Sequence, residues 1–454
     1  MSGWTTSAIL QIVQPDNKTY RVPLKGGSPD RTVTMSTATA TDRATQQRRA
    51  RRASYAGMIA LASGGMVVFP LYPALQEQLG LSTQALGIVA AAGFVAALIA
   101  ELVLAPQADH GRARLMALSG ITAMALSLFV AAMSTEAWQF VASKALGGVG
   151  YGLFFPAVSA VLIRMDPSSA GENLGKLSTA ELAGIAVGPF IASALIGITS
   201  PMVILAASGG LVLLAMYPML RYFREDESAL DSERPGQPTL AIDLLGHRRV
   251  WGAGLLTVAV MVPVGAYDAL WPRYMSDLGA DELLIGASYV LFALPFMLLA
   301  AYAGRLGDRL GGGKAFARGL VVLLAMIVLY GVLTNPWAVT GIGMVESSGQ
   351  ALAFVGAATA MAQAVTVRRA GAAQGLARAM GLIGAAIASA FAGWAYVIGG
   401  AQLLFFGTAV IVLVAAIAAW VLLRGRTSGP AIGDEELVDA VGVSTLAAEA
   451  STVS

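Results

Sequence analysis

Three charged side chains stand inside long apolar runs of the sequence, where an ionised group is costly. They are Lys144, Asp268 and Glu346. At the centre of a bilayer such a charge costs ~2.5–3.5 kcal/mol even on the milder scales, so each residue calls for a partner or a task. A carboxyl group there can bind and release a proton, with Asp268 as the first candidate and Glu346 as the second. A structural ion pair between Lys144 and either acid is the alternative, and the sequence leaves both interpretations open.

Three further charges lie nearer the ends of apolar runs. Glu181 follows Ser178 by three residues, which is the spacing of a capping box at a helix N-terminus, and we favour that role. Glu101 is close enough to the end of its run to reach the membrane surface or pair with an arginine there. Arg378 is expected to reach back to the lipid headgroups, with a part in gating as the alternative.

A glycine-rich, mostly cationic stretch at 304–314 raises the question of a phosphate site. A P-loop needs a preceding strand and a Gly-Lys-Ser/Thr sequence that enters a helix, but here Lys314 is followed by Ala315. Both flanking runs are long enough to cross a bilayer. The stretch is therefore predicted to be a short cytoplasmic turn between two transmembrane helices. Asp308 would lie at a helix end, and Arg309 is among the arginines that would hold the turn at the headgroups.

The composition indicates an integral membrane protein. Of the 454 residues, 56% are hydrophobic and only 12% are charged, whereas soluble domains keep about a quarter of their residues charged. There is no cysteine, which excludes disulfides, thiolate metal sites and a cysteine nucleophile, and the two histidines, His110 and His247, argue against a histidine metal site. We also find no nucleophile–base pair and no nucleotide motif. We therefore expect no enzyme activity, no cofactor and no nucleic-acid partner.

Apolar runs of spanning length, about 20 residues each, divide the chain into two sets of six predicted helices. A polar loop at 223–249 separates the sets, and a polar tail follows at 425–454. The predicted fold is an all-α integral membrane protein with twelve transmembrane helices, built as one six-helix bundle over 54–222 and another over 250–424. The predicted spans are 54–76, 84–106, 115–133, 137–163, 177–199, 202–222, 250–276, 282–303, 315–334, 337–366, 372–398 and 402–424.

The segment 1–53 is polar and has no apolar stretch long enough for a signal-peptide core. We predict a disordered cytoplasmic tail, with Met35 as an alternative start to Met1. The tail ends in an arginine cluster that acts as a topology signal or rests on anionic lipid. The cluster comprises Arg48, Arg49, Arg51 and Arg52.

Lysine and arginine concentrate in loops on one side of the predicted membrane. The loops on the side of the N-terminus carry them, and Arg273 is the one cation near the opposite loops, which are acidic. By the positive-inside rule, both termini are predicted to be cytoplasmic in a multi-pass protein of the cell membrane. Tryptophans at both sets of helix ends fit an aromatic belt.

The two halves of the chain repeat one another. A proline and an aspartate recur at a fixed offset, which is harder to attribute to composition than matches of glycine or leucine. Two parallel six-helix repeats are typical of transporters, whose ligand site lies near mid-membrane between the halves. The pairs at an offset of 199 are Pro73, Leu79, Gly80, Gly87 and Asp109 with Pro272, Leu278, Gly279, Gly286 and Asp308.

With these features, the sequence resembles the major facilitator superfamily of transporters over 54–424. The turn at 304–314 is similar to the superfamily's G-x-L-x-D-R-x-G-x-x-K motif, whereas the copy at the first repeat is degraded. The resemblance implies that these turns link neighbouring helices in one of two access states, with helix capping and topology as the alternative for Asp109. The motif residues are Gly304, Leu306, Asp308, Arg309, Gly311 and Lys314 in the second turn, and Asp109, Gly111, Arg112 and Arg114 in the first.

The predicted fifth helix contains Gly184-x-x-x-Gly188-Pro189. Small residues at i and i+4 let helix backbones approach closely, and the proline removes a backbone hydrogen bond and bends the helix. Within the superfamily the motif resembles the antiporter signature of drug exporters. The corresponding helix of the second half keeps Gly384 but has no Gly-Pro pair. The resemblance favours export over uptake.

The resemblance also implies that Lys144, Asp268 and Glu346 surround one chamber. We therefore predict a secondary transporter that exports small amphipathic or drug-like molecules in exchange for protons by alternating access. Its partners would be the substrate, protons and membrane lipid, and it would act as a monomer. A proton-coupled uptake symporter for a metabolite such as a sugar or organic acid is the alternative; a non-transporting scaffold would need a larger folded loop or tail. Candidate substrate contacts are Tyr72, Tyr151, Phe154 and Trp271.

Overall fold

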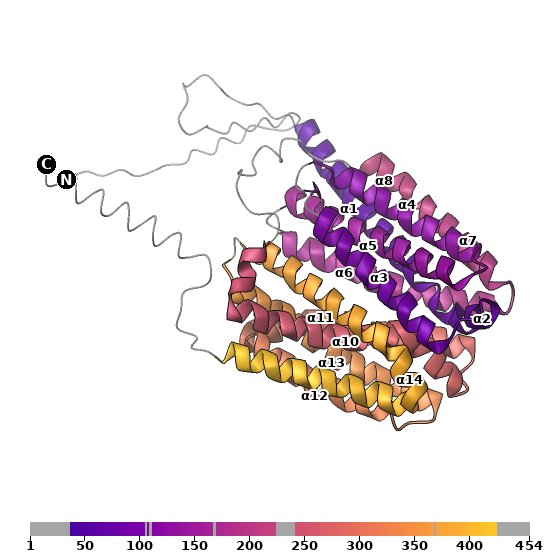
Figure 1. Cartoon of the computed structure of the whole chain (residues 1–454). Coiled ribbons are helices and arrows are strands. Elements are labelled where there is room, and N and C mark those ends of the chain that lie inside the picture. Colours follow the sequence, from indigo (N-terminus) through magenta and orange to yellow (C-terminus); the bar gives the residue numbers. More distant parts are fainter. Residues whose placement is uncertain are drawn as a thin grey trace, which may run out of the picture.

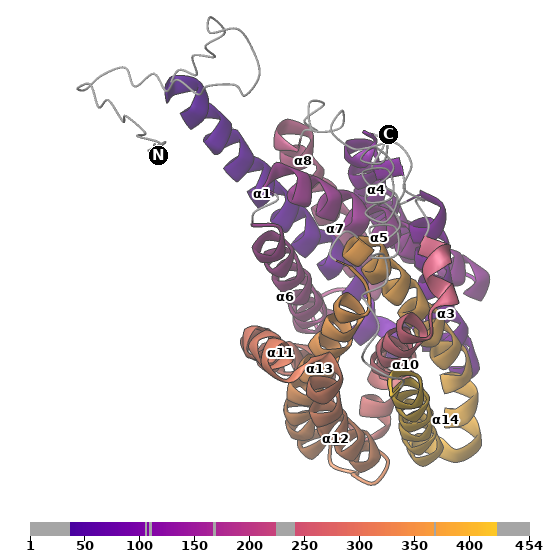
Figure 2. The same ribbon diagram turned by 90° about the vertical axis from the view of Figure 1, so that its left-hand side faces the viewer.

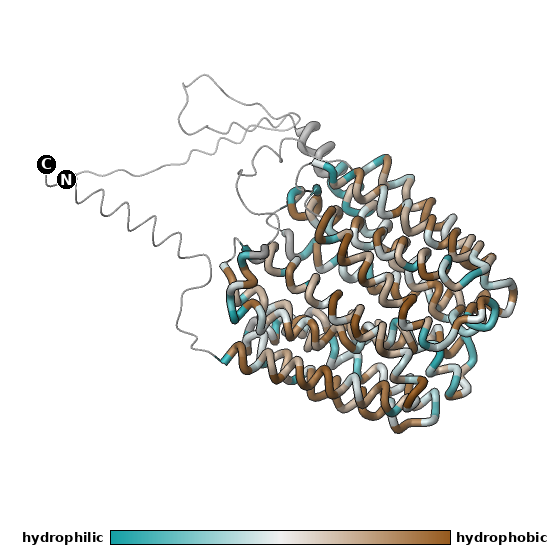
Figure 3. The backbone as a smooth tube through the Cα atoms, viewed as in Figure 1, coloured by the Kyte–Doolittle hydropathy of each residue, from teal (hydrophilic) through white to brown (hydrophobic). Residues whose placement is uncertain are grey.

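The computed structural model describes residues 37–104, 107–108, 111–166, 169–223, 241–366 and 369–424, and this part of the chain is almost entirely helical. A helix satisfies its own backbone hydrogen bonds, which lipid cannot do. Ten helices within the described ranges are long and apolar enough to cross a membrane. Hydrophobic residues lie along the middle of the bundle, and hydrophilic residues gather at its two ends (Figure 3).

The N-terminal half contains two spans that are interrupted. The first breaks after Met66, where Pro70 and Pro73 lack the N–H that a continuous helix needs. The sixth breaks at Ala215, since Pro218 cannot donate to the carbonyl of Leu214. The elements are α1 (Thr37–Met66), η1 (Phe69–Leu71), α2 (Tyr72–Gln78), α3 (Thr83–Leu104), α4 (Ala113–Ala132), α5 (Ala137–Met165), α6 (Ala170–Ile196), α7 (Pro201–Leu214) and α8 (Met216–Tyr222).

The C-terminal half begins with a short 3-10 helix and ends with an interrupted α-helix. Its last element runs through Gly399 and Gly400, which are not helical, so two helices meet there; Gly400 has a φ of 61°, which glycine adopts without strain. The elements are η4 (Ala241–Gly246), α10 (Arg248–Asp277), α11 (Glu282–Leu310), α12 (Gly312–Tyr330), α13 (Pro336–Ala364) and α14 (Ala370–Leu423).

The predicted count of twelve spans remains a prediction. The ten candidate spans include α14 once, although it is broken at Gly399 and Gly400. They do not include α13, which has 29 residues but a less apolar sequence. Twelve spans result if α14 crosses twice and α13 crosses once.

The two halves form two bundles that lie side by side (Figures 1 and 2). The most extensive contacts between them are those of α3 with α14 and of α6 with α11, and α10 also contacts α3 and α2. We call the end at which α1 begins and α14 ends the terminus end, and the opposite end the far end. The repeat is visible in the turns: Gly80 and Gly279 have φ of 61° and 81° before α3 and α11, and Gly111 and Gly311 have φ of 76° and 83° before α4 and α12.

Three predicted boundaries are wrong. The tail predicted to be disordered through residue 53 is helical from Thr37, and the predicted loop 223–249 contains η4 and the start of α10. The glycine-rich turn at 304–314 is mostly helix, because α11 continues to Leu310 and only Gly311 separates it from α12. The remainder of the predicted tails and loop, 1–36, 224–240 and 425–454, lies outside the described residues.

Candidate functional site

A cavity of about 2150 Å³ lies between the two halves. Helices from both halves line it, and most of its wall is apolar or aromatic. The cavity reaches the terminus end, where Leu102, Arg164 and Gln374 belong to its wall. At the far end the halves are in contact: a Cβ on Gly393 would lie 2.6 Å from the carbonyl oxygen of Thr83. The cavity therefore reaches the terminus end, and α3 and α14 of the two halves touch at the far end.

Glu346 lies in the cavity wall, fully buried on α13. Tyr267 of α10 donates its hydroxyl to Oε1 at 2.5 Å, and Tyr330 of α12 donates to Oε2 at 2.6 Å. Within the described part of the chain no lysine or arginine pairs with this carboxyl group. Trp271 packs against both tyrosine rings, at 5.6 and 5.2 Å between centroids. Glu346 is thus held by phenol hydroxyls in an aromatic surround rather than by a counter-ion.

Lys144 and Asp268 meet across the boundary between the halves. Lys144 comes from α5 and Asp268 from α10, and their Nζ and Oδ2 atoms are 3.8 Å apart. The ammonium group also lies 4.3 Å from the centroid of the Phe69 ring, within range of a cation–π interaction. Of the two predicted partners of Lys144, the structure brings Asp268 to it and places Glu346 with tyrosines.

The four predicted aromatic contacts fall into two groups. Tyr151 and Trp271 line the cavity. Tyr72 and Phe154 are fully buried and do not belong to its wall. Phe154 lies at the joint of three helices, where a Cβ on Gly57 would be 2.9 Å from its ring.

A second ion pair joins the halves nearer the terminus end. Arg378 of α14 donates from Nε to Oε1 of Glu101 on α3 at 2.7 Å. Its guanidinium group also lies over the rings of Phe155 and Tyr151, at 4.3 and 5.5 Å from their centroids. The expectation that Arg378 reaches the headgroups is therefore wrong, because its helix turns the side chain into the boundary between the halves.

Glu181 lies in the cavity wall and not at a helix start. Its helix, α6, begins at Ala170, so the capping box predicted for Ser178 and Glu181 is wrong. No hydrogen bond or ion pair to Glu181 occurs among the described residues. The prediction placed the helix start too late because the apolar run begins after a polar but helical first turn.

The gating turns are described only in part. Asp109 and the side chain of Asp308 lie outside the described residues. In the first turn, Arg112 donates from Nη1 to Oε1 of Gln107 at 2.8 Å. In the second, Gly304 and Arg309 are helical, Lys314 is exposed, and the N–H of Gly312 donates to Oε1 of Gln363 at 3.2 Å. The latch role remains a prediction.

The helix motif of α6 packs directly on α1. A Cβ on Gly184 would lie 2.6 Å from the carbonyl oxygen of Ile59, and one on Gly188 would collide with the backbone of Ser63. The Ser63 hydroxyl donates to the carbonyl of Gly184 at 3.2 Å. Pro189 lies where α6 meets α11 of the other half, since its carbonyl oxygen is 2.9 Å from a Cβ built on Gly286. The motif sets helix spacing on both sides of α6.

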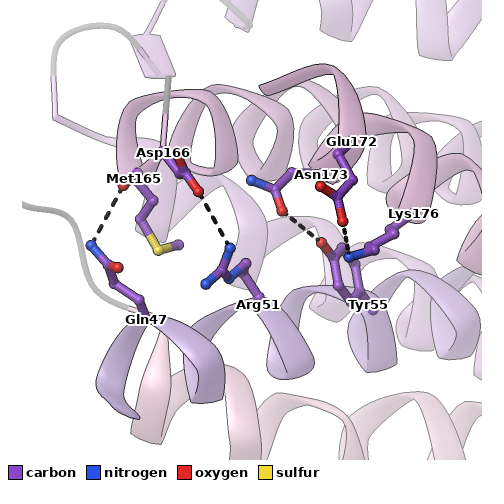
Figure 4. A network of polar contacts seen from close by, with 8 residues as sticks. All are labelled: Gln47, Arg51, Tyr55, Met165, Asp166, Glu172, Asn173 and Lys176. Carbon is purple, nitrogen blue, oxygen red and sulfur yellow. Dashed lines mark hydrogen bonds and ion pairs between the residues drawn. The ribbon is translucent and has the colours of Figure 1, made fainter. Parts of the chain in front are cut away.

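A polar network at the terminus end ties α1 to α5 and α6 (Figure 4). Arg51 pairs with Asp166 at 3.6 Å, and Tyr55 donates to Oδ1 of Asn173 at 3.3 Å. The Gln47 amide donates to the carbonyl of Met165 at 3.4 Å. These contacts explain why the segment before residue 54 continues α1.

The two tyrosines that hold Glu346 and the partner of Arg378 were not predicted from the sequence. A tyrosine in an apolar helix needs a hydrogen-bond partner for its hydroxyl. Tyr267 and Tyr330 both lie in apolar helices, and this could have suggested them as partners of a buried acid. Tyr267 also precedes Asp268 directly. For Arg378 the only signal was a second charge at similar depth, Glu101, on a helix of the other half.

Comparisons with known proteins agree with this architecture. Multidrug resistance protein MdtG of Serratia proteamaculans is 25% identical over 291 residues, which cover 60% of this chain and 68% of that protein. A bacterial homolog of the human lysosomal transporter Spinster, in an inward-facing conformation, has a TM-score of 0.68 at 12% identity over 83% of this chain and 96% of that one. The nucleoside transporter NupG has a TM-score of 0.69 at 13% identity over 84% and 100%. Such structural likenesses show the fold alone.

The family model gives the decisive match. It covers residues 54–267 and, in a second match, 253–448, so each half of the repeat is included. Together with the helical bundles and the cavity between them, this match identifies a multi-pass membrane transporter: the chain belongs to the Major Facilitator Superfamily.

Proposed function

We propose that this protein exports small amphipathic or drug-like molecules across the cell membrane in exchange for protons. The observation that carries the proposal is the cavity between the halves, which combines a largely apolar wall with a buried acid that pairs with no cation in the described part of the chain. Its volume of about 2150 Å³ exceeds the ~300–1,000 Å³ of an ordinary drug-sized pocket. An apolar wall of this size accepts molecules of different shapes. The similarity to multidrug resistance protein MdtG supports the same substrate class.

Glu346 is the better candidate for the proton site. Asp268 already faces Lys144, so its charge is balanced, whereas the partners of Glu346 among the described residues are the hydroxyls of Tyr267 and Tyr330. Two phenols stabilise the ionised carboxylate by donating to it. A protonated carboxyl group can also donate to a phenol oxygen, so the same pocket accommodates both states. We therefore place Glu346 before Asp268, in reverse of the order expected from the sequence.

Alternating access by rocking of the two halves accounts for the shape of the cavity. The halves touch at the far end and the cavity extends to the terminus end. The lysines and arginines of the loops support cytoplasmic termini. With that orientation, this conformation would receive substrate from the cytoplasm, and closing of the terminus end would carry it outward. Both halves belong to one chain, which supports a monomer as the working unit.

The test uses the purified protein in liposomes with an imposed proton gradient. Wild type should move an amphipathic dye against its gradient when protons flow the other way. Glu346→Gln, which resembles the neutral acid, should lose proton-driven movement but keep exchange of labelled for unlabelled dye. Asp268→Asn should keep a proton-driven component. If Glu346→Gln responds to the proton gradient as wild type does, the assignment of the proton site is wrong.

Removing the hydroxyl of either tyrosine tests the same proton site in a second way. Loss of a hydrogen bond to a charged group costs about 1.5–3 kcal/mol, so Tyr267→Phe or Tyr330→Phe should slow proton-driven export by about tenfold or more. Tyr274→Phe is the matched control, since its hydroxyl donates to the carbonyl of Tyr330 and not to Glu346. Equal effects of all three substitutions would point to packing instead of proton binding.

Direction is tested in cells. Expressing cells should retain less of an exported compound, and a protonophore should abolish the difference. Protonophore-sensitive accumulation of a sugar or organic acid, without efflux of any amphipathic compound, would instead support an uptake symporter.

A further inference from the structure

One corner of the cavity holds hydrogen-bond donors without acceptors. Lys144 and Asp268 meet there, but 3.8 Å between Nζ and Oδ2 is beyond hydrogen-bond distance, and neither side chain makes a hydrogen bond within the described chain. Tyr289 of α11 lines the same corner, with its ring centroid 5.8 Å from that of Phe69. Its buried hydroxyl also has no partner among the described residues.

A second hydroxyl without a partner lies just behind the wall. Tyr72 is fully buried and packs edge-on against Phe69 and Phe140, whose rings line the cavity. No described residue accepts its hydroxyl. The Phe69 ring connects these groups: the Lys144 ammonium group and the rings of Tyr289 and Tyr72 lie 4.3, 5.8 and 5.3 Å from its centroid. Buried polar groups nearly always have partners, so three donor groups around one ring, none of them hydrogen-bonded within the described chain, indicate a ligand that brings acceptor atoms.

We propose that this corner binds the anionic head of an amphipathic substrate, a carboxylate. In the present structure the carboxylate of Asp268 occupies the position beside Lys144 that the substrate's head would take. The incoming carboxylate accepts hydrogen bonds from Nζ of Lys144 and the hydroxyl of Tyr289, and the apolar wall receives the tail. Lys144 is then a substrate-binding residue and Asp268 its internal competitor.

A cationic head fits this corner less well. Lys144 would repel it, and the donors would stay without acceptors. The other acids of the cavity wall are Glu346, which already accepts from Tyr267 and Tyr330, and Glu101 and Glu181, which lie nearer the terminus end. There Arg378 already pairs with Glu101. The corner around Lys144 therefore selects for a negative or acceptor-rich group.

The proposal rests on the proposed function only in taking the cavity as the substrate site, so its test measures binding without transport. The full chain in lipid nanodiscs is titrated with phenylbutyrate, phenylbutyramide and phenylbutylamine, three ligands that share a tail and differ in the head. Calorimetry gives the dissociation constants. We expect the carboxylate to bind at least ~10-fold more tightly than the amide, as for a hydrogen bond to a charged group.

Substitutions at the two charged residues should act in opposite directions. Lys144→Gln should reduce phenylbutyrate affinity to that of the amide, while amide affinity stays unchanged. Asp268→Asn should raise phenylbutyrate affinity, because it removes the competing carboxylate at nearly constant volume. Tyr289→Phe should weaken the carboxylate a few-fold and spare the amide. Lys176→Gln is the control for loss of a lysine charge, since Lys176 pairs with Glu172 on the exposed side of α6.

Three results would overturn the proposal: equal affinity for carboxylate and amide, tighter binding of the amine, or an equal loss for all three ligands in Lys144→Gln. The first result would mean that water or a small ion fills the corner. If the carboxylate preference and its Lys144 dependence hold but no compound is exported in liposomes, the transport proposal fails and the binding site stands.

Discussion

Among the described residues two ion pairs join the halves, and they differ in how closely their charged groups approach. Lys144 and Asp268 are 3.8 Å apart without a hydrogen bond, whereas Arg378 and Glu101 are hydrogen-bonded at 2.7 Å. The first pair therefore has room to exchange partners during a transport cycle. The second fixes α3 to α14 in this conformation.

Charge reversal tests the second pair. Glu101→Gln keeps an acceptor oxygen but removes the negative charge that faces Arg378 in a half-buried position, and the loss should be up to about 1.5–3 kcal/mol, the value of a hydrogen bond to a charged group. Thermal unfolding in detergent, followed by tryptophan fluorescence, should shift to lower temperature. Glu101→Arg should be worse than Glu101→Gln, since two arginines then face each other. The double variant Glu101→Arg with Arg378→Glu should recover part of the loss; no recovery would mean that the stacking of Arg378 on Phe155 matters more than the pair.

The sequence located the charges within the membrane and offered two partners for Lys144, but it could not choose between them or find the partners of Glu346. Hydropathy identifies Lys144, Asp268 and Glu346 as out of place in apolar helices. Which of them meet depends on the rotation of each helix about its axis, and that is set by packing across the bundle. The partners of Glu346 could not be derived for this reason: Tyr267 and Tyr330 come from two other helices.

At the scale of single elements, α6 shows how a glycine motif sets helix spacing. Gly188 lies against the backbone of Ser63, so the substitution Gly188→Ala must push α1 and α6 apart. Overpacking of this kind costs about 1–3 kcal/mol, which a lower unfolding temperature would report. Gly175→Ala on the same helix is the matched control, because no atom lies within 4 Å of its added Cβ. It should be neutral or stabilising by about 0.5–1 kcal/mol, and similar losses in both variants would argue against the packing role.

Helix existence was predicted well and helix ends poorly. Both ends of α11 illustrate why. Its start, with Asp281 as the cap that accepts from the N–H of Leu284, matches the expected 282–303 span. Its C-terminal end does not match the prediction, because α11 continues to Leu310. Arginines and glycines can remain helical outside the apolar layer, and hydropathy reports only where the apolar layer ends. The same reason explains the helical segment before residue 54.

The number of crossings is a property of the whole chain that labelling can measure. The natural sequence lacks cysteine, so single cysteines can be introduced without further change. Gly313→Cys and Gln402→Cys are separated by α12, α13 and the first part of α14. If all three cross, a membrane-impermeant thiol reagent added outside cells should label Gln402→Cys and not Gly313→Cys. Labelling of both positions from one side would exclude the twelve-span topology.

Rocking of the two halves requires their contacts at the far end to open. Arg273 of α10 and Gln76 of α2 form one of these contacts, with Nη1 and Oε1 3.5 Å apart. Because each residue belongs to a different half, a covalent link there should hold the far end closed and stop transport, while substrate still enters from the terminus end. Gln76→Cys with Arg273→Cys, joined by a reducible bifunctional thiol reagent, should lose export in liposomes, keep substrate binding, and regain export after reduction.

The matched control links Thr135→Cys to Gln139→Cys within one half, where the side chain of Gln139 contacts Thr135, and should export normally. Undiminished export by the linked Gln76–Arg273 pair would show that the halves do not separate at this end, and that substrate moves by a route other than alternating access.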